Sequence, residues 1–351
     1  MTPHSPGAHA SSSAVVAPKR RLLAYAFGPG FDHVVRVAAV LRRLTRYRDV
    51  EAHILTNHTV LGREAYPNFT FYECPMAGKS IVPKLRELII RVKPMLFLVD
   101  GFPKGIYGEL PEVLPDFPCP CVLLQQALAP VDQARGNLPD FVNRHYEITI
   151  AARDALAYPE LGRALQVEPL CLYDHDEFLD EVDAKLELGY AGRPICVFQD
   201  SAPGGVRLYE LLRKQCDTIN GLRVEWRLHT NDTTISSRFP EKEILHGLGF
   251  AHLMRGIRLV VTAAGYSSYH EALAMGVPTL WMPVTANQHD LQQRRVGPMA
   301  ISDPKRLVIS IKSGQIPDSC APLRFNGATV AARYIRQLIG FRHARPDALF
   351  A

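Results

Sequence analysis

Hydrophobic and polar positions along the chain fall into alternating blocks, each of which predicts a strand or a helix. Residues 22–27 form a continuous apolar run, typical of a parallel strand buried on both faces. The loop at 28–33 contains two glycines, and residues 34–44 then follow the spacing of an amphipathic helix. Further strands are predicted at 52–56, 70–73, 95–99, 122–125 and 148–150, the last of this half, with a helix at 84–92. This alternation predicts a Rossmann-like domain with a parallel sheet and helices on both faces.

The pattern weakens at residues 166–192, an acidic and polar stretch that predicts a connector with a surface helix. A second series begins after it, with strands at 195–199 and 222–228 separated by a loop at 200–205 and a helix at 206–215. An amphipathic helix is predicted at 328–339. The expected organisation is a disordered tail at 1–18, a first domain at 19–165, a linker at 166–192, a second domain at 193–325, and a C-terminal helix and tail at 326–351.

The stretch 256–293 combines a strand, a glycine turn, a helix and a second strand. Its first apolar run breaks at Gly265, and Gly276 is expected to end the helix that follows. We expect Ser267 or Ser268 to cap the first turn of this helix. A glycine turn before a helix N-terminus presents unpaired backbone N–H groups, which form a ready binding site for an anion such as phosphate.

Composition and charge narrow the class of protein. With 47% hydrophobic and 21% charged residues among 351, the chain is expected to be soluble and to fill two domains. No apolar run reaches the ~20 residues that span a bilayer. The formal charge of +5 fits phosphate ligands or peripheral contact with an anionic membrane face, whereas the absence of a nucleic-acid-binding motif predicts no nucleic-acid partner. Seven cysteines and no signal peptide predict a cytoplasmic location.

The sequence A-G-Y-S-S-Y-H-E-A-L-A-M-G-V-P-T-L, at residues 264–280, is followed by P-x4-Q ending at Gln288. This stretch resembles the nucleotide-sugar site of MurG-like glycosyltransferases and their UDP-glycosyltransferase relatives. The resemblance implies a GT-B fold, in which two Rossmann-like, doubly wound parallel-sheet domains face each other across a cleft. It also implies that the last helix crosses back to the first domain.

The donor is expected to bind at two glycine loops and at the helix after the second one. Backbone N–H groups at the end of the 200–205 loop suit a diphosphate. By the resemblance, Glu271 holds the ribose, the neighbouring His270 faces phosphate or sugar, and Gln288 reaches the sugar hydroxyls. The expected donor-binding residues are Gly204, Gly205, Gly265, Tyr266, Ser267, Ser268, His270, Glu271 and Gln288.

On the acceptor side, the loop G-P-G-F-D-H ends in His33 and stands where the resembling enzymes have a glycine-rich loop with a terminal histidine. A histidine suits removal of a proton from an acceptor hydroxyl, because its ordinary pKa is about 6.5 and a carboxylate can fix its tautomer. Asp100, at the end of a predicted strand, is the candidate partner, and Asp32 is the nearer rival. No metal and no cofactor are expected, since no D-x-D pair stands at a strand end.

Three functions remain open at this point. The first is an inverting, metal-independent glycosyltransferase that moves a sugar from a nucleotide-sugar donor, with UDP favoured, to a hydroxyl of a small molecule, lipid or glycan. The second is a UDP-sugar hydrolase of the MurG-like type, in which water replaces the acceptor. The third is a non-catalytic protein that binds nucleotide-sugars, favoured by the replacement of the glycine pair before His33 with Phe31 and Asp32.

Overall fold

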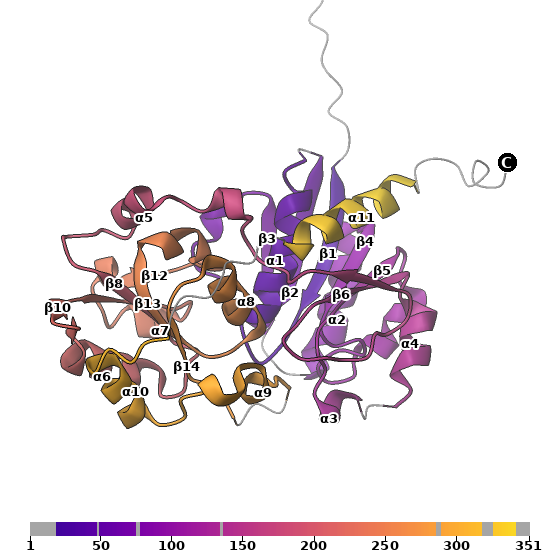
Figure 1. Cartoon of the computed structure of the whole chain (residues 1–351). Coiled ribbons are helices and arrows are strands. Elements are labelled where there is room, and N and C mark those ends of the chain that lie inside the picture. The colour runs from indigo at the N-terminus through magenta and orange to yellow at the C-terminus, as the bar shows by residue number, and fades with distance from the viewer. Residues whose placement is uncertain are drawn as a thin grey trace, which may run out of the picture.

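The computed structural model in Figure 1 shows two parallel sheets, each with its own helices. It describes residues 19–47, 49–74, 78–133, 136–285, 289–317 and 326–341. The expected tail at 1–18 lies outside the described residues. Within the described ranges, no helix has the length and apolar character needed to cross a bilayer.

The first sheet is built from the N-terminal half of the chain. Its strands are β1 (Arg20–Ala26), β2 (Val50–Thr56), β3 (Phe69–Glu73), β4 (Leu96–Asp100), β5 (Cys121–Gln125), β6 (Ile148–Ala152) and β7 (Ala164–Val167). They lie in the order β3-β2-β1-β4-β5-β6-β7 and are all parallel. Successive strands are added in one direction from β1 to β3 and in the other direction from β4 onwards, so the strand order switches between β1 and β4. Doubly wound sheets bind their ligands at this switch point.

The strand β7 was not predicted, so the expectation that residues 148–150 form the last strand of this sheet is wrong. Its four residues, ALQV, are too few to show a period, and three of them are partly exposed at the sheet edge. Pairing with β6 along four positions makes this segment a strand. A short edge strand of this kind depends on its neighbour, and its own sequence carries little signal.

The second sheet holds the order β12-β11-β8-β13-β14, again all parallel. Its strands are β8 (Ile195–Gln199), β11 (Glu225–His229), β12 (Ile244–Leu245), β13 (Ile257–Thr262) and β14 (Thr279–Trp281). The strand predicted at 222–228 is divided in the structure. Its first two residues form β10 (Leu222–Arg223), which pairs antiparallel with β9 (Thr218–Ile219) as a separate hairpin, and only the remainder enters the sheet as β11.

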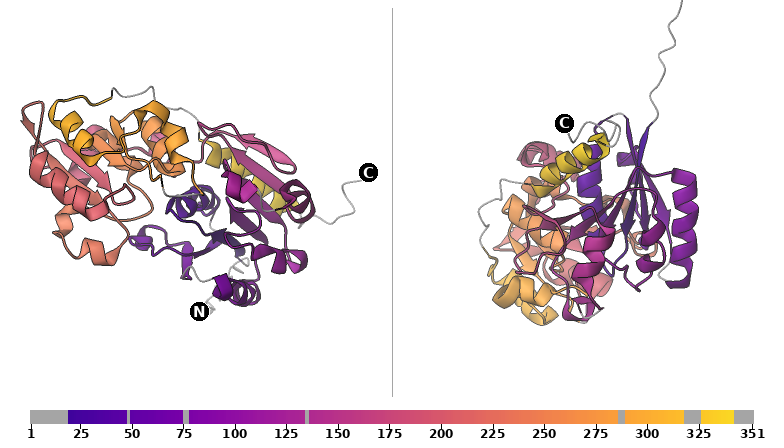
Figure 2. Two further views of the ribbon diagram at one scale, coloured as in Figure 1. Left: turned by 90° about the horizontal axis from the view of Figure 1, so that it is seen from below. Right: turned by 90° about the vertical axis from the view of Figure 1, so that its right-hand side faces the viewer.

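Helices cover both faces of each sheet. They are α1 (Asp32–Leu44), α2 (Gly78–Val92), α3 (Pro130–Gln133), α4 (Leu138–His145), α5 (Glu181–Glu187), α6 (Gly205–Gln215), α7 (Thr233–Ser236), α8 (Tyr266–Met275), α9 (Gln292–Val296), α10 (Pro304–Lys312) and α11 (Gly327–Phe341). On the first sheet, α2 and α11 lie on opposite faces (Figure 2). The second sheet packs against α6 and α10 on one of its faces.

The helix α11 returns to the first domain although it follows the second in sequence. It packs along α1, and its buried residues Ala328, Ala331 and Ile335 join the core on that face of the first sheet. Arg43 on α1 donates from Nε to Thr329 Oγ1 at 2.8 Å. The chain therefore passes between the two domains twice, after β7 and before α11.

Candidate functional site

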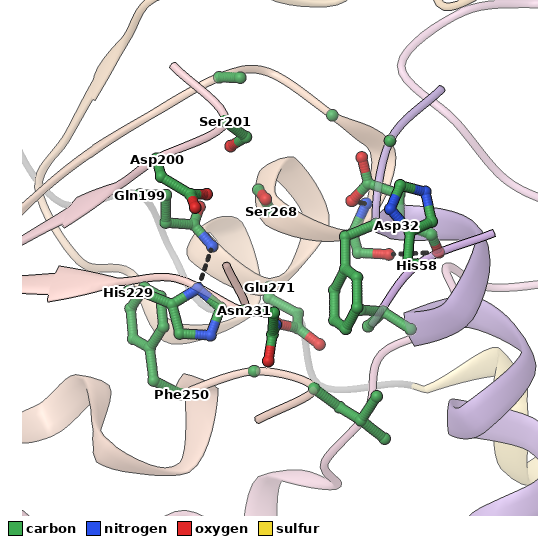
Figure 3. A pocket seen from close by; sticks show the side chains of 18 of the residues that line it. Asp32, His58, Gln199, Asp200, Ser201, His229, Asn231, Phe250, Ser268 and Glu271 are labelled. Atoms are coloured by element: carbon green, nitrogen blue, oxygen red, sulfur yellow. Dashed lines mark hydrogen bonds between the residues drawn. The ribbon is translucent and has the colours of Figure 1, made fainter. Parts of the chain in front are cut away.

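A cavity of about 960 Å³ lies between the two domains. Its walls come from segments that follow strands β1 and β2 of the first sheet and β8, β11 and β13 of the second. Figure 3 shows Asp32 and His58 on one side, Asp200 and His229 on the other, and Ser268 and Glu271 of α8 between them. Carboxyl ends of parallel strands thus face each other across this space, as expected for a ligand site in α/β folds.

The helix α8 begins at this cavity, but neither serine caps it. The N-cap is Gly265, which has no side chain to offer, while Ser267 and Ser268 already lie inside the first turn. The expectation that one of them would cap the helix is therefore wrong, because a capping side chain must come from the residue before the first turn. The Ser267 N–H instead donates to Oδ1 of Asp32, in the other domain, at 3.0 Å.

Glu271 stands one turn into α8 and lines the cavity. Its Oε1 accepts a hydrogen bond from the backbone N–H of Leu172 at 3.1 Å, in the segment that joins the domains. Gly249 lies beside its other oxygen, since a Cβ placed there would be 3.5 Å from Oε2. Burial raises the pKa of Glu271 to about 7. The carboxyl group is therefore poised between its neutral and charged forms near neutral pH.

His33 and Asp100, predicted as a pair, are in contact. His33 Nδ1 lies 2.7 Å from Asp100 Oδ2. Arg36 holds the same carboxylate from Nε at 2.9 Å and from Nη2 at 2.7 Å. Burial by itself would raise the pKa of Asp100, but the charge of Arg36 and the hydrogen bond with His33 outweigh it and hold this pKa below its ordinary value. Asp100 is therefore a carboxylate that fixes both side chains.

The imidazole of His33 is packed behind the loop that precedes α1 and is not among the side chains that line the cavity. It stacks on Phe102, with ring centroids 5.2 Å apart. A Cβ placed on Gly28 would lie 1.8 Å from Cδ2 and 2.1 Å from Nε2 of this ring. The neighbouring Asp32 does line the cavity. His33 therefore stands next to the site, separated from it by the loop at 28–32.

Tyr266 and His270 face the domain interface. The Tyr266 hydroxyl donates to the carbonyl of Arg153 at 3.0 Å. His270 Nε2 lies 3.4 Å from Asp154 Oδ1. Arg295 on α9 donates to both oxygens of that buried carboxylate at 2.9 Å. These side chains join the two domains beneath the cavity and are not among those that line it.

The remaining expected donor residues divide into three groups. Gly265, Ser267 and Ser268 line the cavity. Gly204 and Gly205 form the start of α6 with φ of 91° and 44°, but they are not among the lining residues. Gln288 lies outside the described residues.

Sequence reasoning missed several side chains that line the cavity, namely Asn57, His58, Asp200, His229, Asn231 and Phe250. Most of them sit at or just after the carboxyl end of a strand, and that position was the signal that could have identified them. His229 ends β11 and is 6% exposed. Within the described part of the chain its Nε2 has no hydrogen-bond partner, and burial lowers its pKa to about 4. The imidazole of His229 is therefore neutral near neutral pH and lies in the wall of the cavity.

The electrostatic character of the cavity is unusual for an anion site. Four carboxyl groups line it, those of Asp32, Asp200, Asp232 and Glu271, and no lysine or arginine does so among residues that the structure describes. Arg36 and Arg295 lie nearby but are paired with Asp100 and with Asp154 and Asp290. Across the described ranges, no cluster of three or more His, Cys, Asp or Glu side chains could hold a metal ion. Backbone N–H groups at the start of α8 are therefore the donors that this cavity offers to an anion.

No protein-family model matches the sequence, and no curated protein sequence matches it either. Solved structures match over nearly the whole chain. The glycosyltransferase SsfS6 of Streptomyces sp. SF2575, complexed with thymidine diphosphate, is 15% identical over 91% of this chain and 99% of its own, with a TM-score of 0.54. The glycotransferase of kitacinnamycin is 14% identical over 92% and 100% of the two chains, with a TM-score of 0.55. The spinosyn rhamnosyltransferase SpnG is 16% identical over 92% and 96%, with a TM-score of 0.50.

The fold is GT-B. The fold class predicted from the sequence is thereby confirmed, with a seven-stranded and a five-stranded parallel sheet as its two halves. The cavity described above is the interdomain cleft of this GT-B fold. At sequence identities of 14% to 16%, the likeness to these structures concerns the fold and not the activity.

Proposed function

We propose that this protein is a glycosyltransferase that moves a sugar from a nucleoside diphosphate donor to an acceptor hydroxyl. The observation that carries the proposal is the placement of the α8 N-terminus, with Ser267, Ser268 and Glu271, on a large cavity between the two sheets. The structural similarity to glycosyltransferases, one of which was solved in complex with thymidine diphosphate, supports the same proposed function.

In this proposal the diphosphate binds at the start of α8, where backbone N–H groups and the helix dipole favour negative charge. The carboxylate of Glu271 accepts hydrogen bonds from the ribose hydroxyls, one turn further along the helix. UDP is the first donor to test, and dTDP follows because of the SsfS6 complex.

The catalytic base in this proposal is His33. Asp100 lies 2.7 Å from its Nδ1, which leaves Nε2 to take the proton of the acceptor hydroxyl. The acceptor oxygen then forms a bond to the anomeric carbon from the face opposite the diphosphate. The bond from that carbon to the phosphate oxygen breaks, and the nucleoside diphosphate leaves with the electron pair. The product has the inverted configuration, and access to Nε2 requires movement of the loop at 28–32.

Metal independence belongs to the same proposal. The leaving diphosphate is stabilised by the α8 dipole and by backbone N–H groups at the start of this helix. The lining carboxylates of the described residues do not form a cluster suited to a divalent ion. Charge stabilisation is therefore assigned to the helix N-terminus.

A thermal-shift panel of UDP, dTDP, GDP and ADP tests the donor site on the wild type and on Glu271→Ala. A ligand that binds only the native state raises stability by RT ln(1 + [L]/Kd). We expect one nucleoside diphosphate to raise the melting temperature of the wild type and to lose most of this effect in the variant. No shift with any of the four would refute the donor site. In a separate assay with the matching nucleotide-sugar and no acceptor, release of free sugar would instead identify a hydrolase.

A further inference from the structure

The anion site at the start of α8 is already occupied by a side chain of this protein. We propose that Asp32 takes the place of a donor phosphate when no donor is bound, and that the incoming diphosphate must displace it. The inference rests on the proposed function, because it assigns the α8 N-terminus to the donor.

The contact with α8 has the geometry of an anion bound at a helix start. Oδ1 of Asp32 accepts the Ser267 N–H at 3.0 Å. Its other oxygen lies against the Gly265 Cα, where a Cβ would come within 1.9 Å of Oδ2. The Ser267 hydroxyl donates to the Asp32 carbonyl at 3.4 Å. Glycine at position 265 thus admits a carboxylate that any other residue would exclude, and a phosphate oxygen needs the same space.

Asp32 comes from the opposite domain, which separates this contact from an ordinary helix cap. It begins α1, 235 positions before Ser267. A cap that only stabilises α8 could be supplied locally by a serine or aspartate at position 265. The helix instead begins with glycine and receives its acceptor across the ligand cleft. The arrangement keeps the anion site filled while the donor is absent.

A diphosphate and the Asp32 carboxylate cannot share the site. They would be like charges competing for the same N–H groups in a buried environment, where repulsion is only weakly screened. No lysine or arginine lines the described part of the cavity to offset this repulsion. Donor binding therefore requires Asp32 to leave.

Displacement of Asp32 also affects His33, because the two residues are adjacent at the start of α1. The loop before α1, residues 28–31, has glycine at positions 28 and 30, lies against the His33 ring at Gly28 and leads directly into Asp32. Moving Asp32 away from Gly265 moves the end of this loop.

Asp32→Ala and Asp32→Asn test the displacement by titration calorimetry with the nucleoside diphosphate found in the panel. The alanine variant removes both the charge and the hydrogen-bond acceptor, and the asparagine variant removes only the charge. We expect affinity to rise by at least about tenfold in Asp32→Ala and by less in Asp32→Asn. Asp200→Asn is the matched control, because it removes a carboxylate from the same cavity on the side opposite Asp32.

Hydrogen exchange of the α8 backbone provides a readout that needs no ligand. The N–H of Ser267 is expected to exchange faster in Asp32→Ala than in the wild type, and to regain protection when the nucleotide is added. Unchanged exchange in both variants would overturn the contact itself. An equal rise in affinity for Asp32→Asn and Asp200→Asn would overturn the displacement, because it would show a general effect of removing negative charge from the cavity. Weaker nucleotide binding by Asp32→Ala would also overturn the displacement.

These outcomes separate the inference from the proposed function. If the wild type binds a nucleotide and Asp32→Ala binds it no more tightly, the displacement is wrong and the donor site stands. If none of the four proteins binds a nucleotide although exchange at Ser267 increases in Asp32→Ala, the proposed function is wrong and the displacement falls with it.

Discussion

Glu271 gives the structure a measurable pH dependence. Burial raises its pKa to about 7, against an ordinary value of 4.5. The folded protein therefore holds this proton more tightly than the unfolded chain does. Between these two values the folded state binds more protons, so stability falls as the pH rises. Below about pH 4.5 the buried group carries no penalty, and above about pH 7 the full penalty of an ionised buried carboxylate is present.

The change Glu271→Gln removes this penalty and keeps an oxygen for the N–H of Leu172. The pKa difference, at about 1.36 kcal/mol for each factor of ten in proton affinity, sets an upper bound of roughly 3 kcal/mol. From the two pKa values, the variant should exceed the wild type by roughly 1 kcal/mol at pH 5 and by roughly 3 kcal/mol at pH 8.5. The gain must therefore grow with pH.

Thermal melts at pH 5 and pH 8.5, followed by circular dichroism, measure this gain without any ligand. Each kcal/mol corresponds to roughly 2–4 °C for a domain of this size. Glu64→Gln is the control, because Glu64 is exposed on the surface and the same change there should leave both melts unaltered. The same Glu271 variant should bind the nucleotide about tenfold or more weakly, since hydrogen bonds to a charged acceptor contribute about 1.5–3 kcal/mol.

A loss of stability in Glu271→Gln that is equal at the two pH values would refute this reasoning. It would mean that the carboxylate is ionised and stabilises the fold through its hydrogen bond with Leu172. A gain that is equal at both values would show that the pKa is not raised. Only a gain that increases with pH agrees with a buried carboxyl group whose pKa is raised.

Four further predictions follow. Arg295→Met leaves the buried Asp154 carboxylate without its main partner and should cost about 3–5 kcal/mol in a denaturant melt, while the double change with Asp154→Leu should recover most of the loss; a double-variant loss equal to the sum of the two single-variant losses would show that the pair is not coupled. Gly28→Ala should destabilise the protein by about 1–3 kcal/mol because its Cβ meets the His33 ring at 1.8 Å, whereas at Gly30 the nearest atom is 3.7 Å away and alanine should be tolerated in the same melt. In a sugar-transfer assay, His33→Gln should lower turnover by about 100-fold with unchanged nucleotide affinity, and EDTA should leave wild-type turnover intact; loss with EDTA that magnesium or manganese restores would contradict metal independence.

The local pattern of the sequence was enough to predict the architecture. Apolar runs followed by glycine turns and amphipathic spacing located most strands of both sheets, because burial on both faces of a parallel sheet leaves a strong signal. Gly276 was predicted to end α8, and it does so with a φ of 64°. The helix after the second glycine loop, with Ser267, Ser268 and Glu271 on the cavity, was also found from local sequence and resemblance.

The predictions that were wrong concern segments whose secondary structure depends on pairing with another strand. The edge strand β7 exists because β6 pairs with it, and the predicted strand at 222–228 divides because its first residues pair with β9. The glycine loop before α6 has the sequence of a phosphate loop, yet the packing of the domains leaves Gly204 and Gly205 out of the cavity lining. The sequence of a loop shows which backbone groups it can offer to a ligand, but it does not show whether the folded loop lies at the cavity.

The composition of the site was settled by the approach of the two domains. Asp32 reaches Ser267 across 235 positions, and Arg295 reaches Asp154 across 141. No periodicity links such residues, because periodicity reports only which side chains share a face of one helix or strand. The sequence by itself determined two strand–glycine–helix domains and a helix N-terminus suited to an anion. Only the tertiary structure decided that a carboxylate from the other domain fills that N-terminus, since this depends on how two separately encoded surfaces meet.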